Sequence, residues 1–205
     1  MKNILKSKNI KNLFHFTRAE NLENILKYGL LPRQVLMEND IDSLFNDYYR
    51  YDNCEDAVCM SLEFPNYKMF YQLRRENLDT EWIVLWLDAE IICDFDCAFC
   101  SGNAGSASMF QTNILDRKGK EAFLKLFDEP TIGATRKEMN LPDCYPTNPQ
   151  AEILVFGNIP TEYIKKVYFN DMQTLNKYRV LFKDPQMCGV SAQLFSYRHD
   201  YEYWR

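Results

Sequence analysis

The sequence predicts a single α+β domain. A chain of 205 residues with 46% hydrophobic and 26% charged residues has the size and balance of one globular domain. Segments typical of strands and helices alternate along it without the regular rhythm of a parallel sheet with crossover helices. The sequence contains no internal repeat, low-complexity tract or Gly/Ser/Pro-rich linker. We therefore expect residues 1–205 to form one domain.

Short apolar runs mark the expected strands. The sequence WIVLWL at residues 82–87 is uninterrupted by polar residues, which predicts a strand buried on both faces. Another apolar run begins on a carboxylate, Glu152. The expected strands, in chain order, are residues 13–17, 57–61, 82–87, 152–156, 166–169 and 193–197.

Helices are expected between these strands, at residues 19–28, 66–75, 119–128 and 171–182. In the first of them Leu22, Ile25 and Leu26 share one face, and Gly29 stands where a helix can end. Thr17 and Glu20 have the spacing of a capping box at its start. We expect a loop with a short helix at residues 32–53, an irregular segment at 93–108, and a long polar loop at 129–149, a length typical of functional loops.

Charge and aromatic content narrow the classes of function. The formal net charge is −5, which argues against a protein that coats long duplex DNA through its phosphates. The 13 Tyr and 14 Phe suit either the stacking of flat ligands or an aromatic core. A local basic groove for a short strand remains compatible with both observations.

The apolar segments and the cysteines of the sequence predict the cellular compartment. No stretch is long and apolar enough for a transmembrane helix, and residues 1–12 carry four Lys but no apolar signal-peptide core. The 7 Cys are an odd number, which favours reduced thiols. We expect a cytoplasmic protein without a membrane partner.

The first candidate constellation is His15 and Thr17 at the end of the first strand. A His at a strand end beside a helix N-terminus can bind ribose hydroxyls or a carboxamide, and the helix N–H groups can bind a phosphate. The alternative is a core His with Thr17 as a helix cap.

The second constellation is Gln150-Ala151-Glu152. A Glu at the start of an apolar strand places its carboxylate at the sheet end, and Gln150 lies two residues earlier, on the same face by strand alternation. A carboxylate beside a ribose can stabilise an oxocarbenium-like transition state and accept a proton from a nucleophile. The alternative is a solvated Glu on an edge strand.

The third constellation is the helix at residues 66–75. Its aromatic residues can stack on nicotinamide or on a base, and its two arginines can meet phosphate. The alternative is an amphipathic helix with an aromatic core face.

The fourth is Cys93, Cys97 and Cys100. Their spacing is similar to the cluster-binding motif of radical SAM enzymes. Only 105 residues follow Cys100, however, which is too few for that architecture. Buried thiols are the favoured interpretation, and we expect no metal.

Together the constellations resemble one family, the DarT toxins, over roughly residues 12–170. The ordered set of motifs that carries the resemblance is His15-x-Thr17, Gly29-Leu30-Leu31, Ser61, Met69-Phe70-Tyr71, Arg74-Arg75, Asn103-Ala104 and Gln150-Ala151-Glu152. The resemblance implies an ADP-ribosyltransferase fold, with a central split antiparallel sheet flanked by helices and long substrate loops. It also implies NAD+ as co-substrate, a single-stranded nucleic acid as acceptor, and an antitoxin partner that removes the modification.

The resemblance also implies roles for particular residues. Glu152 and Arg50 match the catalytic pair. Contacts to NAD+ are implied for His15, Thr17, Tyr71, Arg74 and Asn103. Gln150 and Arg75 are implied to contact the substrate strand. Residues 33–53 correspond to the NAD-binding loop-helix, and residues 110–150 to the loop that presents the nucleic acid.

One departure bears on the target base. Thymidine-directed members carry an Arg a few residues before the catalytic Glu, whereas residues 145–149 here read Tyr-Pro-Thr-Asn-Pro. The sequence therefore predicts transfer of one ADP-ribose to thymine or guanine in single-stranded DNA. The alternatives are an RNA or protein acceptor, an iron–sulfur enzyme using the three cysteines, and a binding module without turnover.

Overall fold

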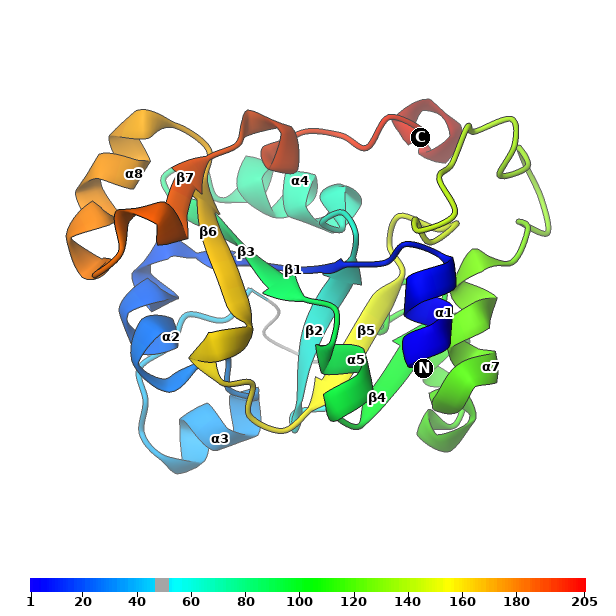
Figure 1. Ribbon diagram of the computed structural model, residues 1–205, viewed down its shortest axis with the longest axis horizontal. Coiled ribbons are helices and arrows are strands. Elements are labelled where there is room, and N and C mark those ends of the chain that lie inside the picture. Colours follow the sequence, from blue (N-terminus) through cyan, green and yellow to red (C-terminus); the bar gives the residue numbers. More distant parts are fainter. Residues whose placement is uncertain (47–51) are drawn as a thin grey trace.

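The computed structural model describes residues 1–46 and 52–205 (Figure 1). Its strands are β1 (Asn12–Arg18), β2 (Ala57–Leu62), β3 (Trp82–Asp88), β4 (Cys97–Cys100), β5 (Glu152–Phe156), β6 (Ile164–Phe169) and β7 (Cys188–Val190). Its α-helices are α1 (Lys2–Ser7), α2 (Leu22–Tyr28), α3 (Arg33–Glu38), α4 (Tyr67–Glu76), α5 (Ile91–Asp94), α6 (Ala107–Phe110), α7 (Gly119–Leu124) and α8 (Met172–Tyr178).

The strands form one sheet in the order β4-β5-β2-β1-β3-β6-β7. Every pairing is antiparallel except the last, in which β7 lies parallel to β6. The predicted α+β class with a largely antiparallel sheet is confirmed, and the parallel edge makes the sheet mixed.

The sheet is split in the middle. β1 pairs with β3 along its whole length, but it pairs with β2 only at Leu13–Leu62 and Phe14–Ser61. Beyond these two pairs the strands diverge, and in Figure 1 β1 runs across the view while β2, β5 and β4 rise steeply. The two halves of the sheet are therefore joined by a narrow seam, which we call the β1–β2 seam.

Side-chain alternation places the main core on one face of the sheet. Leu13 and Ile153 point into that core with the apolar sides of α1, α2, α5 and α7. On the opposite face Phe14 joins a smaller cluster under α4, and Leu154 joins another under the turn that follows β4. Glu152 lies on the same face as Leu154 by the same alternation, so its carboxylate is on the side away from the main core.

Three local expectations were wrong. Residues 193–197 form no strand, because Leu194 and Phe195 pack under α4 in the 3₁₀ turn η7 (Ala192–Phe195). β4 was missed because its four residues are all buried and show no alternation. Thr17 does not cap a helix, because it still lies in β1 and its hydroxyl accepts a bond from Asn21, after the turn η1 (Ala19–Asn21).

The predicted substrate loop at residues 110–150 consists of two unlike parts. Its first part contains the 3₁₀ turn η2 (Ile114–Arg117), helix α7 and the turn η3 (Lys125–Phe127), and these pack against β4. Residues 128–151, all of them described, contain no helix or strand. The C-terminal segment runs over α4 and ends beside this loop (Figure 1).

Gly29 closes α2 at a position that only glycine fits. Its φ is +85°, and an added Cβ would lie 2.2 Å from the carbonyl O of Ile159. This approach allows the bridge between Leu30 and Ile159 that holds α2 to the sheet. We expect Gly29→Ala to lower the free energy of unfolding by about 2 kcal/mol or more, measured by chemical denaturation. Gly157→Ala is the control, since its φ is +91° but nothing lies within 4 Å of the added Cβ; an equal loss in both variants would contradict the steric argument.

Candidate active site

A cleft opens where β1 and β2 diverge beyond the β1–β2 seam. The cleft is lined by residues of both strands, by α2 and the start of α3, by residues 43–46, and by Met69, Asn103, Gly105 and Glu152. Apolar walls with a few polar groups are typical of sites for small molecules and cofactors. The split of the sheet is thus what creates the site.

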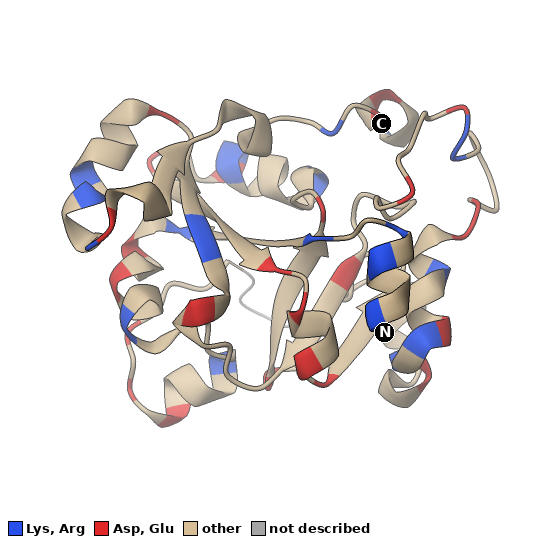
Figure 2. Cartoon of the chain, viewed as in Figure 1, with Lys and Arg blue, Asp and Glu red and all other residues tan. Residues whose placement is uncertain are grey.

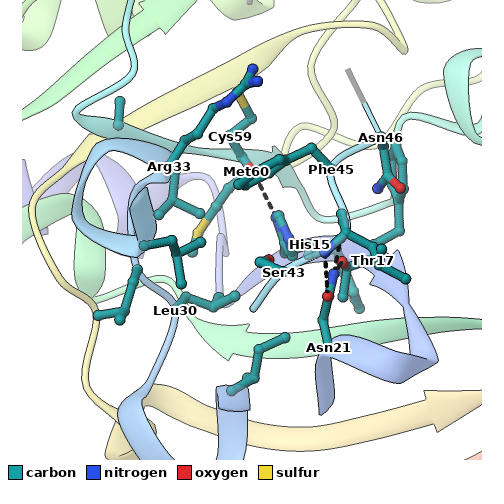
Figure 3. Close-up of a pocket in the computed structure, with 18 of the residues that line it drawn as sticks. His15, Thr17, Asn21, Leu30, Arg33, Ser43, Phe45, Asn46, Cys59 and Met60 are labelled. Carbon is teal, nitrogen blue, oxygen red and sulfur yellow. Dashed lines mark hydrogen bonds between the residues drawn. The ribbon is translucent and has the colours of Figure 1, made fainter. Parts of the chain in front are cut away.

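One wall of the cleft is a loop fastened by Asn21. The buried Asn21 amide donates to Thr17 Oγ1 and to the carbonyl O of Leu44, both at 2.9 Å (Figure 3). Its side-chain oxygen also accepts from the backbone N–H of Leu44 at 2.8 Å. Asn24 donates to the carbonyl O of Asp42 at 2.8 Å. These bonds attach residues 42–44 to β1 and α2, and so shape the cleft before any ligand binds.

His15 bridges the two diverging strands. Its Nδ1 lies 2.8 Å from the carbonyl O of Cys59 on β2 (Figure 3). Because a carbonyl can only accept, Nδ1 carries the proton in the neutral ring and Nε2 is an acceptor. His15 and Thr17 both line the cleft, one on each side of Phe16 in β1.

Glu152 is held at the far end of the cleft as the first residue of β5. It is 7% exposed. One carboxylate oxygen accepts from the backbone N–H of Ala104 at 2.7 Å, and the other lies 3.4 Å from the Asn66 side-chain nitrogen. Asn66 is itself fixed, because its backbone N–H donates to Ser61 Oγ at 3.0 Å and its side-chain oxygen caps α4. The carboxylate is therefore oriented by groups from two separate segments, one of which is itself held by β2.

Asn103 shapes the turn that contacts Glu152. Its side-chain oxygen accepts from the N–H of Gly105 at 2.9 Å, which folds residues 103–105 into a tight turn and aims the N–H of Ala104 at the carboxylate. Its side-chain nitrogen lies 4.0 Å from the sulfur of Met69. The structure thus brings together Glu152, Asn103, His15 and Thr17, four of the predicted site residues.

The other described candidates do not line the cleft. Met69 faces it, and Tyr71 lies about 200° further around α4, at 3.6 residues per turn, where its ring packs against Tyr197. The Arg74 guanidinium lies 4.8 Å over the Phe70 ring, and Arg75 lies over Tyr71. On this helix Met69, and not Tyr71 or Arg74, lines the cleft.

Gln150 does not share a face with Glu152 by strand alternation. It belongs to a turn before the strand, where its backbone N–H donates to the side chain of Asn148 at 2.9 Å. The strand begins only at Glu152. The alternation argument therefore did not apply at this position.

Arg50, the predicted partner of Glu152, lies outside the described residues. Within the described part of the predicted loop-helix, Arg33 lines the cleft, and its guanidinium lies 4.5 Å from the Phe45 ring (Figure 3). Sequence reasoning passed over Arg33, although an Arg at the start of a helix was the available signal.

Sequence reasoning also missed a buried ion pair in the C-terminal segment and the hydrogen bonds that it makes. The buried Arg198 and Asp200 form an ion pair at 2.6 Å. The same guanidinium donates to the carbonyl oxygens of Pro146 and Thr147, both at 2.9 Å. These bonds attach the C-terminal segment to the loop that leads into Glu152. We call this arrangement the Arg198 clamp.

Cys93, Cys97 and Cys100 do not converge. Cys97 points into the main core and Cys100 into the cluster on the opposite face of β4. Burial raises the pKa of Cys97 to about 12 and that of Cys100 to about 11, which favours neutral thiols over the thiolates that ligate iron. The three cysteines therefore lack the geometry for the iron–sulfur alternative. In the described part of the chain, no three His, Cys, Asp or Glu side chains are grouped as metal ligands.

Residues 14–201 match the protein-family model described as "DarT: ssDNA thymidine ADP-ribosyltransferase, DarT". The chain belongs to the DarT family. This DarT-family chain is an NAD+-dependent ADP-ribosyltransferase that modifies a base in single-stranded DNA, as its sequence motifs predicted.

Solved structures share the fold of this DarT-family chain at low sequence identity. Thermosipho africanus DarTG in complex with ADP-ribose aligns with a TM-score of 0.63 at 14% identity, covering 90% of this chain and 51% of that one. This chain thus spans about half the length of that DarTG protein. Thermus sp. 2.9 DarT in complex with carba-NAD+ aligns with a TM-score of 0.61 at 15% identity, covering 90% and 97%. The same Thermus protein with ADP-ribosylated ssDNA aligns at 0.60 and 14%, covering 90% and 96%.

No significant match was found among curated proteins. Across residues 1–46 and 52–205, no helix is both long and apolar enough to cross a membrane.

Proposed function

We propose that the cleft binds NAD+ and that Glu152 is the catalytic carboxylate for transfer of one ADP-ribose to thymine in single-stranded DNA. The observation that carries this proposal is the buried carboxylate of Glu152, fixed by Ala104 and Asn66 at the end of a pre-shaped cleft. The neighbouring Thermus protein binds carba-NAD+ and ADP-ribosylated ssDNA by its description, which supports the same pair of ligands here.

NAD+ is assigned to the cleft by the chemistry of its walls. His15 Nε2 can accept from a ribose hydroxyl or carboxamide, since Nδ1 is already bonded to Cys59. Phe45 and Met69 provide apolar surface for flat rings, and Thr17 and Asn103 provide polar contacts. Arg33 lines the cleft, and its positive charge suits the diphosphate of NAD+. Arg50 is proposed to act with Glu152 on the nearby ribose.

Glu152 has two chemical tasks in this proposal. Its carboxylate accepts a hydrogen bond from the ribose 2′-hydroxyl and stabilises positive charge as the C1′–nicotinamide bond breaks. The bonding electron pair leaves with neutral nicotinamide. A ring nitrogen of the base then bonds to C1′, and its proton passes to Glu152 and onward to water. At C1′ one C–N bond is broken and one is formed, the N–H bond of the base is broken as its proton is transferred, and no oxidant is required.

The choice of base rests on the family model, whose description names thymidine. Residues 145–149 lack the Arg expected in thymidine-directed members, so guanine is the second candidate. Gln150, in the turn before the catalytic strand, is proposed to lie along the substrate strand.

The test is the intact mass of short DNA and RNA oligonucleotides, each with one kind of target base, after incubation with the protein and NAD+. We expect a gain of one ADP-ribose on the thymine-containing DNA. A gain on the guanine oligonucleotide alone would replace thymine by guanine. A gain on RNA alone, or on none of them, would contradict the DNA-base proposal.

The physiological role proposed is that of the toxin of a toxin–antitoxin pair. The Thermosipho relative is described as a DarTG protein, which supports a partner hydrolase that removes the ADP-ribose. A cytoplasmic location agrees with the reduced state of the seven cysteines.

A further inference from the structure

Three tyrosine rings and two arginines form a continuous row on the surface. The ring centroids of Tyr71 and Tyr197 are 5.2 Å apart, and Tyr197 stacks on Tyr201 at 4.9 Å with an interplanar angle of 20°. Arg75 lies 5.7 Å from the Tyr71 ring at one end, and Arg205 lies 5.3 Å from the Tyr201 ring at the other. We call these five residues the tyrosine strip.

The tyrosine strip is exposed although its support is buried. Tyr71 is 36% exposed and Tyr197 is 41% exposed. Beneath them the buried Tyr67 packs edge-on against Tyr197 at 5.9 Å. Arg198 lies between Tyr197 and Tyr201 in the sequence, so the Arg198 clamp fixes the backbone that carries these two rings. The rings are therefore held in place by the fold, with Tyr71 and Tyr197 exposed and Tyr201 half-buried.

Charge at the strip suits a polyanion. Arg75 is exposed and forms no ion pair with a carboxylate in the described part of the chain. Arg205 is paired with Glu202 at 3.0 Å, so the charge of Arg205 is partly offset. Lys68 on α4 donates to the carbonyl O of Trp204. Figure 2 shows the basic positions of α4 above the sheet, in a protein whose net charge is −5.

The strip begins close to the catalytic cleft. Asn66 at the start of α4 contacts Glu152, and Met69 on the same helix lines the cleft. Tyr71 is five residues beyond Asn66, about 7.5 Å along a helix axis, and it lies on the side of α4 away from the cleft, across a helix about 10 Å in diameter. A strand with one base in the cleft therefore reaches the strip by passing around α4, over several nucleotides at about 3.4 Å for each.

We propose that the tyrosine strip binds the single-stranded DNA that flanks the modified base. This inference rests on the proposed function, and it adds a second contact region to the same reaction. Bases stack on Tyr71, Tyr197 and Tyr201, and Arg75 contacts phosphate. Stacking explains how an acidic protein holds DNA, because rings recognise unpaired bases without a large basic surface. A duplex keeps its bases stacked on one another and is excluded.

The experiment compares a trinucleotide with a 15-mer, each containing one target base, as substrates with NAD+. The test variant is Tyr197→Leu with Tyr201→Leu, and the matched variant is Tyr197→Phe with Tyr201→Phe, which keeps both rings. Tyr163→Leu is the distant control, since Tyr163 packs on Phe95 away from the strip. Binding of the fluorescent 15-mer without NAD+ is measured for every variant.

The wild type is expected to prefer the 15-mer in kcat/KM. The Leu double variant should lower the ratio of 15-mer to trinucleotide by about fivefold or more and weaken 15-mer binding similarly, whereas the Phe double variant and Tyr163→Leu should keep the wild-type ratio. Equal ratios in the wild type and the Leu double variant would overturn the proposal that the strip binds DNA. If the wild type modifies neither oligonucleotide, the proposed function fails, and the binding arm still decides: unchanged 15-mer affinity in the Leu double variant overturns the strip, and a fivefold loss supports it.

Discussion

Glu152→Gln is expected to reduce ADP-ribosyl transfer at least about 100-fold while leaving the fold intact. Glutamine has nearly the same shape but cannot carry the negative charge that stabilises the breaking C1′ bond or accept the proton of the base. Loss of one preorganised electrostatic group costs about 3 kcal/mol of activation free energy. The measurement is the initial rate of mass gain on the oligonucleotide that the wild type modifies.

Glu162→Gln is the matched control for this loss. Glu162 is exposed in a turn before β6, so its substitution should leave the rate unchanged. Thermal unfolding of both variants checks the fold. Transfer by Glu152→Gln above about a tenth of the wild-type rate would remove Glu152 from the catalytic role.

Arg198→Ala is expected to lower the free energy of unfolding by about 3–5 kcal/mol and to loosen the loop before Glu152. The substitution leaves Asp200 as a buried carboxylate without its cation, and a broken buried ion pair is typically this costly. It also removes the donors to the carbonyl oxygens of Pro146 and Thr147. Chemical denaturation measures the stability, and hydrogen exchange measures the mobility of residues 142–150.

A surface ion pair is the control for the clamp. Lys177 lies 2.6 Å from Glu81 but its side chain is 63% exposed, so Lys177→Ala should cost under about 1 kcal/mol. Arg198→Lys keeps the charge and loses the fork of donors, which separates the two contributions. Unchanged exchange at residues 142–150 in Arg198→Ala would show that the clamp does not hold the loop.

The part of the site that could be predicted from sequence is the strand start at Glu152, where a side chain reaches the edge of a sheet. His15, 137 positions earlier, was expected at a strand end but lies in the middle of β1, and it reaches the cleft because β2 diverges from β1 beside it. Their meeting depends on the strand order β5-β2-β1, which no local pattern encodes. The divergence at the β1–β2 seam was implied by the family resemblance and by nothing in the two strands themselves.

The helix α4 illustrates why the remaining site residues were misplaced. Its aromatic and basic residues surround the helix, so composition could not show which face meets the cleft. The phase was set by Phe70, which packs under η7 and between Phe16 and Trp82. That packing turns Met69 toward the cleft and Tyr71 away from it. Tertiary packing therefore decided which of these two side chains lines the cleft.

The β1–β2 seam has a thermodynamic consequence. With only two residue pairs joining them, the halves of the sheet depend on few backbone bonds for mutual stability. A dinucleotide bound in the cleft as we propose would touch both halves, so its binding free energy would be added to their cohesion. The enzyme is then most resistant to unfolding and proteolysis when its own co-substrate is abundant. As a cell's NAD+ is drained, the population of opened molecules rises, and the lifetime of the protein falls with the metabolite it consumes.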